Sequence, residues 1–343
     1  MILNAYSVLD ASLTLLRLLL ALAVVAIGLS VMKQRRRLAS DELTPVENRQ
    51  YLLFLVAGLL VVLNVLSWPL LYLLLESYVP EWPGVMCIYG VTQIGVGSDG
   101  PAGYLPRLLQ IVQILKAALV FASGAWAVLY LANRRTRSAP LTGRVVWTTI
   151  IVGVLASVDA AGEAAYLAIP KKEEAPSVGC CVTPVGDQSR FLPHGIAGEL
   201  NNSWLHVAYY GANAAVILGL LVTIRMNAAH KPVPRLAPLG LLALVNAAAT
   251  TTFLIDVAAP AILHLPYHHC LYDLVPRAPE SLLAVAAFVF ATFAIGWACA
   301  TAWGARCAET EPFLGEQIRM TLVAALFAYV GSIAMVSIEV AVS

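Results

Sequence analysis

Long runs of apolar residues alternate with short polar connections along the whole chain. A hydrocarbon core about 30 Å thick needs roughly 20 apolar residues in one helix, and eight segments meet this requirement. The pattern predicts an all-α integral membrane protein, a single eight-helix transmembrane bundle over residues 1–343. The eight predicted spans are 8–32, 50–76, 107–132, 145–169, 203–226, 236–263, 280–303 and 319–341.

Composition supports a membrane location and excludes several function classes. Hydrophobic residues make up 60% of the chain and charged residues 12%, well outside the range of soluble domains. The formal net charge of +1 indicates no nucleic-acid partner. Motifs for nucleotide binding, a zinc protease or a catalytic triad are missing from the sequence. The lipid bilayer is therefore the expected partner, and the sequence leaves open whether the chain is an enzyme.

Basic residues are distributed unevenly between the two sets of loops. Because basic loops stay in the cytoplasm, the distribution predicts that both termini are extracytoplasmic (N-out, C-out), in a bacterial inner (plasma) membrane. The loops on the cytoplasmic side hold Lys33, Arg35, Arg36, Arg37, Arg49, Arg134, Arg135, Arg137, Arg144, Arg225, Lys231, Arg235, Arg306 and Arg319. The other side holds Arg107, Lys171, Lys172, Arg190 and Arg277.

Four cysteines fall in three outer connections, namely Cys87, Cys180, Cys181 and Cys270. We expect the three loops, 77–106, 170–202 and 265–279, to form an extracytoplasmic cap over the helix ends. Cys87 and Cys270 share a frame in which proline precedes the cysteine by four residues and tyrosine follows it by two. These connections are equivalent if the bundle is a parallel 4+4 duplication.

The outer cysteines admit three interpretations. Two disulfides joining the loops are typical of an oxidising compartment. A metal site is the second, because thiolate, thioether and imidazole donors suit copper first among the transition metals. Its candidate ligands are Cys87, Cys180, Cys181, Cys270, His268, His269, His264 and Met86. A thiol–disulfide relay with a quinone or a soluble partner is the third.

Two histidines at the outer ends of predicted spans are candidate haem ligands. His206 begins the fifth span and His264 ends the sixth, at similar depth. Lone interfacial histidines more often place a polar tip in the headgroup region. Haem and quinone are therefore weaker cofactor candidates than copper.

Five ionisable residues lie within predicted spans and away from the span ends, and we expect them to form a charge network: Arg17, Lys116, Asp159, Glu163 and Asp256. A charge in the hydrocarbon must pair or line a wet cavity. Asp159 and Glu163 share one helical face, so each raises the other's cost of ionisation. We expect Lys116 or Arg17 to pair with one of them and the other to be protonated or to face water.

These observations support three hypotheses of different classes. The first is a protein that binds or transports a transition metal, copper first, through the outer Cys/His/Met cluster above the membrane carboxylates. The second is a thiol–disulfide or quinone-linked oxidoreductase that uses the same cysteines. The third is a structural subunit of a respiratory or transport complex. Expected partners are other membrane subunits or a periplasmic metal or redox carrier.

Overall fold

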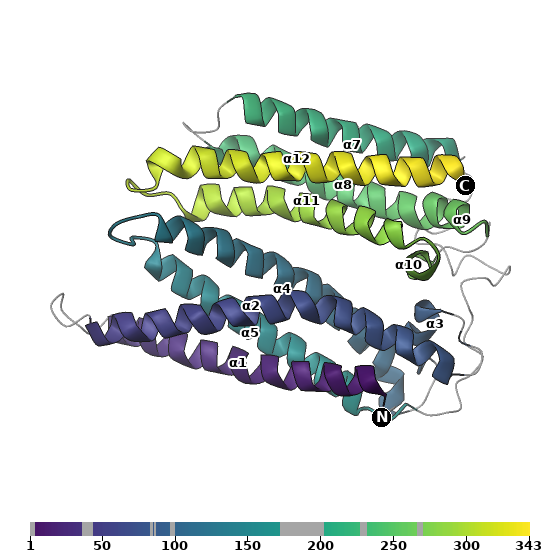
Figure 1. Cartoon of the computed structure of the whole chain (residues 1–343), viewed down its shortest axis with the longest axis horizontal. Coiled ribbons are helices and arrows are strands. Elements are labelled where there is room, and N and C mark those ends of the chain that lie inside the picture. Colours follow the sequence, from purple (N-terminus) through teal and green to yellow (C-terminus); the bar gives the residue numbers. More distant parts are fainter. Residues whose placement is uncertain are drawn as a thin grey trace. The chain divides into compact units, whose positions relative to one another are not determined.

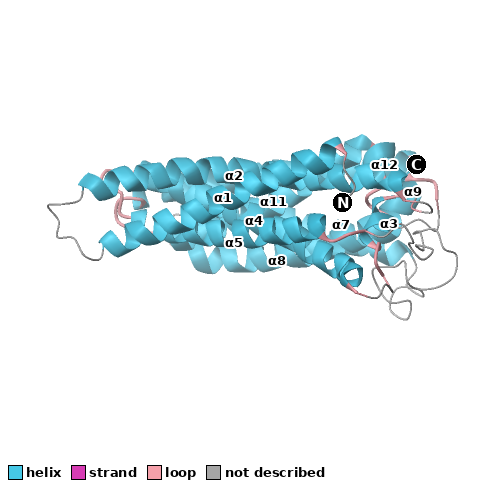
Figure 2. Ribbon diagram, turned by 90° about the horizontal axis from the view of Figure 1, so that it is seen from below, coloured by secondary structure: helices cyan, strands magenta, loops and turns pink. Residues whose placement is uncertain are grey.

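The computed structural model describes residues 4–35, 44–82, 85, 87–96, 100–171, 202–226, 232–265 and 270–343 (Figure 1). Every regular element in these ranges is helical (Figure 2). The chain divides into two compact units, Met1–Val178 and Gly179–Ser343, and each is described by itself.

The first unit is an up-and-down bundle of four long helices. They are α1 (Ala5–Arg35), α2 (Thr44–Tyr78), α4 (Leu105–Arg134) and α5 (Thr142–Ala168). α1 packs against both α2 and α5, and α4 packs against α5 and α2. Between α2 and α4 lie the 3₁₀ turn η2 (Val79–Glu81), the short helix α3 (Ile88–Thr92) and the 3₁₀ turn η3 (Pro101–Tyr104). α3 contacts α2 and α4.

The second unit also contains four long helices. Its long helices are α7 (Asn202–Arg225), α8 (Pro232–Phe253), α11 (Pro279–Gly304) and α12 (Glu311–Val342). The π-helical turn η5 (Leu254–Ala258) and α9 (Ala259–Ile262) continue α8, and the short helix α10 (Leu274–Arg277) precedes α11. Neighbouring pairs are α7 with α8, α8 with α11, α11 with α12 and α12 with α7.

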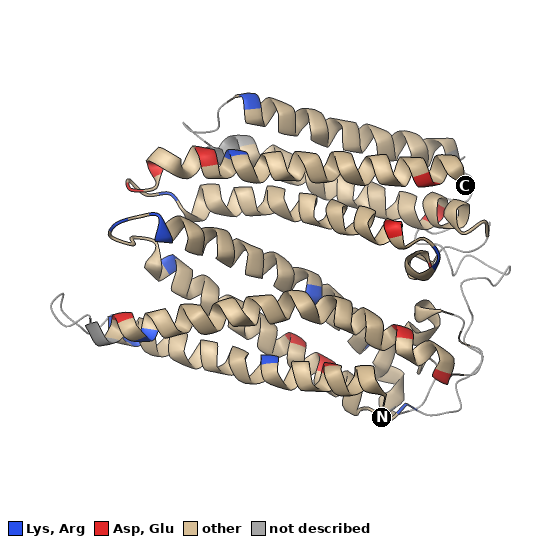
Figure 3. Cartoon of the chain, viewed as in Figure 1, with Lys and Arg blue, Asp and Glu red and all other residues tan. Residues whose placement is uncertain are grey.

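Within the described ranges, eight helices are long and apolar enough to cross a membrane, which agrees with the predicted number of such helices. The outward faces are apolar: on α1, Leu15 and Leu19 are 59% and 58% exposed. Exposed leucines at this density on a helix face suit lipid rather than water. In the first unit, basic residues lie at the ends where α1 joins α2 and α4 joins α5, whereas in the second unit the end where α11 joins α12 carries acidic as well as basic residues (Figure 3). The helices fit an integral membrane protein.

α1 and α5 approach closely because glycines line their crossing. A Cβ built on Gly153 of α5 would lie 2.9 Å from Val25 Cγ2 and 3.2 Å from the Ala21 carbonyl oxygen. A Cβ on Gly28 of α1 would lie 2.7 Å from a side-chain atom of Ile150. Small residues let membrane helices pack backbone to backbone, where apolar burial alone gives no net attraction in lipid.

Gly153→Ala should therefore destabilise the first unit by about 1–3 kcal/mol, the usual cost of overpacking. Gly58→Ala is the matched control, because a Cβ there meets nothing within 4 Å and alanine favours the helix. Thermal unfolding of both variants in one detergent measures the difference. Equal melting temperatures would contradict the close α1–α5 contact.

Candidate functional site

The buried face of α1 changes character halfway along the helix. Its buried residues recur every three or four positions, as an inward stripe requires. Toward the C-terminal end they are small or apolar, from Ala21 onward. Toward the N-terminal end every one is polar: Ser7, Asp10, Thr14 and Arg17. The polar half of this stripe faces the site.

Four buried charged side chains meet at the centre of the first unit. Arg17 Nη1 lies 2.9 Å from Glu163 Oε2, and Arg17 Nη2 also bonds Asp159 Oδ2. Lys116 Nζ lies 2.9 Å from Asp159 Oδ2 and 2.7 Å from Glu163 Oε2. All four side chains are 0% exposed. Two cations from α1 and α4 thus share two carboxylates from α5.

Neutral polar side chains accept further hydrogen bonds from the two cations. Arg17 Nε donates to Asn64 Oδ1 at 3.3 Å, and Lys116 Nζ contacts Ser67 Oγ at 3.2 Å. Both neutral residues lie on α2, so all four long helices of the unit reach the cluster. Asn64 Nδ2 also donates to Ser123 Oγ on α4 at 3.4 Å. Because the surrounding medium is apolar, these contacts are what makes the buried charges tolerable.

Four of the five residues of the expected network meet within the first unit. Arg17, Lys116, Asp159 and Glu163 come together, whereas Asp256 belongs to the second unit, on its π-helical turn. Cations reach both carboxylates of α5, where we expected them to reach one, and the protonation of either carboxyl stays a prediction. The i, i+4 spacing places both oxygens toward the same two cations, so both are paired and neither is exposed.

Asp10 is a third carboxylate of the cluster that the sequence interpretation missed. It is 1% exposed and faces the Glu163 carboxyl. It was missed because acidic residues are common near helix N-termini, where the helix dipole favours a negative charge. The available signal was its spacing of seven residues from Arg17, which places both on one face of α1.

Lys171 lies at the end of the first unit where α1 begins, and it contacts Tyr166 and Tyr78 rather than the buried carboxylates. It follows α5, donates to the Tyr166 carbonyl oxygen at 2.8 Å, and lies 4.3 Å and 5.7 Å from the ring centres of Tyr166 and Tyr78. Burial lowers the pKa of the Lys171 ammonium to about 8. The contact with two aromatic faces holds the amine over the end of the bundle.

The second unit has a neutral polar centre instead. Asn246 Nδ2 donates to Asn213 Oδ1 at 3.0 Å, and Asn213 Nδ2 reaches Thr250 Oγ1 at 3.3 Å. The Thr292 and Tyr329 hydroxyls lie 2.8 Å apart. Hydrogen bonds between helices stabilise membrane bundles modestly, by about 0.6 kcal/mol each on average.

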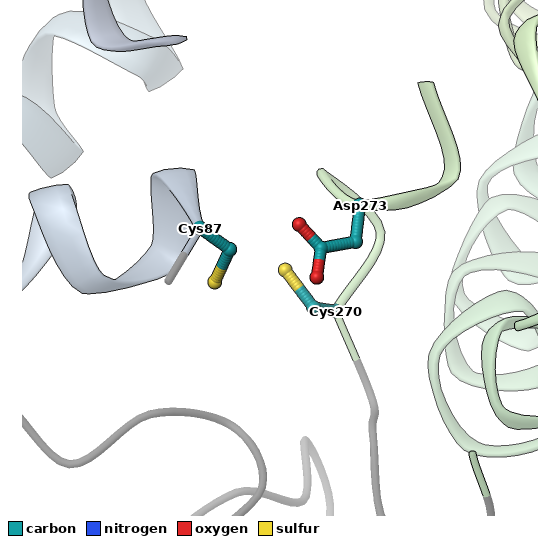
Figure 4. A group of neighbouring side chains, drawn as sticks. All are labelled: Cys87, Cys270 and Asp273. Atoms are coloured by element: carbon teal, nitrogen blue, oxygen red, sulfur yellow. The ribbon is translucent and has the colours of Figure 1, made fainter. Parts of the chain in front are cut away.

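The outer cysteine cluster is described only in part. In the second unit, Cys270 Sγ and an Asp273 carboxylate oxygen lie within 4.8 Å of each other (Figure 4). Cys87, also labelled there, belongs to the first unit, where it is buried and immediately precedes α3. Asp273 was missed as a candidate ligand, although its spacing of three residues from Cys270 was a usable signal. The candidates Met86, Cys180, Cys181, His268 and His269 lie outside the described residues.

The two haem candidates have different surroundings within the second unit. The His206 ring packs edge-on against Phe253, with ring centres 5.2 Å apart. His264 is exposed, and its φ of 52° lies in the left-handed region. The haem interpretation stays a prediction, as do the disulfide pairings. Comparison of the chain with known protein families, curated proteins and solved structures finds no match.

Lys116→Met should destabilise the protein by about 3–5 kcal/mol, because it leaves a buried carboxylate without one of its two cations. Adding Asp159→Asn should recover much of this loss, since the number of charges again balances. Thermal or denaturant unfolding measures both. Arg319→Met is the control, because its ion pair with Glu316 is about half exposed. If Lys116→Met alone melts at the same temperature as the parent, the pairing of Lys116 with the carboxylates is refuted.

Lys171 predicts a pH dependence of stability. Between about pH 8 and 10.5 the folded chain releases a proton that the unfolded lysine keeps. The free energy of unfolding therefore rises with pH across this window. The melting temperature of the parent, relative to that of Lys171→Met, should rise as the pH is raised across this window. Lys33→Met, at an exposed lysine on the far end of α1, should show no such trend. A constant difference for Lys171→Met would contradict the assignment.

Proposed function

We propose that the protein binds a transition metal, copper first, at its extracytoplasmic face, and that this ion is its transported or delivered substrate. The proposed ligands are Cys270 and Asp273 together with Cys87. The observation that carries the proposal is the Cys270–Asp273 pair, a thiol and a carboxylate within 4.8 Å on one short loop. Thiolate and carboxylate together can hold a divalent first-row ion.

We include Cys87 among the proposed ligands because of its position between two candidate spans. It follows the second candidate span and Cys270 follows the sixth. Helices that cross a membrane in alternating directions place both connections at the same surface. Each cysteine also precedes a short helix that leads into the third long helix of its unit.

The 4+4 duplication is part of the proposal, and a second spacing supports it. Asn64 precedes Cys87 by 23 positions, and Asn246 precedes Cys270 by 24. The π-helical turn lies between the last two residues, and a π turn accommodates one extra residue in a helix. Both asparagines hydrogen-bond the first long helix of their unit. The two halves thus carry matching polar positions as well as matching cysteines.

The remaining donors and the sidedness complete the proposal. His268 and His269 directly precede Cys270, Met86 directly precedes Cys87, and Cys180 and Cys181 lie in the third outer loop. These residues would supply further soft ligands. The excess of basic residues on the opposite loops favours an extracytoplasmic position for all of them. The cation-paired carboxylates of α5 would then lie beneath the metal, inside the membrane.

Elemental analysis of the purified protein tests the proposal. The parent should carry about one equivalent of metal, and Cys270→Ser and Asp273→Asn should each lose at least tenfold in affinity, the usual lower range for losing a ligand or its support. Cys307→Ser is the matched control, a cysteine of the same unit in the turn between α11 and α12. Equal metal content in Cys270→Ser and Cys307→Ser would refute the site.

The same preparation separates the alternatives. An impermeant chelator added to sealed right-side-out vesicles should strip the metal, whereas protection would contradict the sidedness. Trapping of mixed thiol and disulfide states with no bound metal would favour the thiol–disulfide oxidoreductase. Two intact disulfides with no bound metal would favour the structural subunit.

A further inference from the structure

The charges of the buried cluster do not balance. Arg17 and Lys116 contribute two positive charges, and Asp10, Asp159 and Glu163 contribute three potential negative charges. All five residues are at most 1% exposed. An uncompensated charge at this depth is expensive even by the most lenient scale, about 2.5–3.5 kcal/mol. One bound proton makes the cluster neutral.

The hydrogen bonds indicate where that proton belongs. Glu163 Oε1 and Asp159 Oδ1 have no hydrogen-bond partner among the described donors, but Asp10 is the carboxyl of the cluster that has none at either oxygen. Glu163 Oε2 already accepts from Arg17 and Lys116. Because Asp10 faces Glu163, a proton on one carboxyl would supply the missing donor to the other. Two ionised carboxylates in that arrangement would repel each other.

The groups around Asp10 come from every helix packed on it. They are Arg17 from α1, Tyr78 from α2, Lys116 from α4, and Glu163 and Tyr166 from α5. The Tyr78 hydroxyl is buried and has no described hydrogen-bond partner, and it lies at the last residue of α2. Asp10 is five residues from the start of α1, about 8 Å along the axis. Tyr78 therefore lies toward the surface from which Asp10 is reached.

We propose that Asp10 and Glu163 form a proton-binding site inside the membrane, sharing one proton that enters past Tyr78 from the surface at which α1 begins. The proton occupies the Asp10 carboxyl and bonds Glu163 Oε1. Its release leaves a net negative charge among Arg17, Lys116 and three carboxylates, so proton release and rearrangement of the ion pairs are coupled. The site does not depend on the metal proposal.

Infrared spectroscopy of the protein in lipid nanodiscs tests this assignment. At neutral pH the parent should show the carbonyl band of a protonated carboxylic acid, which shifts in D₂O and disappears as the pH is raised. Asp10→Asn should lose this band while remaining folded, since the amide can donate to Glu163 in place of the proton. Glu316→Gln, at an exposed carboxylate, should keep it. A parent without the band, or a band that survives in Asp10→Asn, would overturn the proposal.

Two further variants keep the assignment and the route testable. If Asp10→Asn does not fold, Asp10→Glu should shift the same band, and an unshifted band overturns the site. Tyr78→Phe should slow exchange of the proton with D₂O relative to Tyr329→Phe, whose hydroxyl is in the second unit. Equal exchange rates would overturn entry past Tyr78. The metal content of Asp10→Asn should equal that of the parent, which separates this test from that of the metal site.

Discussion

Two cations that share two carboxylates in an apolar medium are the interaction on which the first unit depends. Arg17, Lys116, Asp159 and Glu163 come from three helices and are completely buried. None of these charges could be placed in hydrocarbon alone, so each helix is stable in this position only when the others are present. The same requirement explains why α2 contributes Asn64 and Ser67, each of which accepts one more hydrogen bond from a cation.

The two units differ in the polar groups that join their helices. The second unit joins its helices through amides and hydroxyls, such as those of Asn213 and Asn246, which need no counter-charge. The first unit uses charges, which cost more to bury and are sensitive to protonation. These hydrogen bonds of the second unit avoid the free-energy cost of burying charges. The charged centre with its extra carboxyl is therefore the part of the fold best suited to respond to a proton.

The proposed metal ligands lie in the connections between helices rather than within the spans. Cys270 and Asp273 lie on a loop shaped by α9 and α10, and α10 packs on the start of α11. Leu274 and Leu263 share a small apolar cluster beneath this loop. The proposed metal ligands would thus rest on packed helices, and a rigid support is what a binding site requires of its scaffold.

The sequence by itself determined the spans, because about 20 apolar residues in a row have few alternatives in a chain of this composition. It also identified Arg17, Lys116, Asp159 and Glu163, since a charge within such a run must find a partner. Only the tertiary structure decided which partners they have. Asp256 and Asp10 are both acids near a helix end, and hydropathy does not distinguish them. Asp10 joins the cluster because α1 and α5 cross closely at Gly28 and Gly153, which directs the face of α1 that carries Asp10 toward Glu163. That crossing depends on contacts between residues more than a hundred positions apart in the chain.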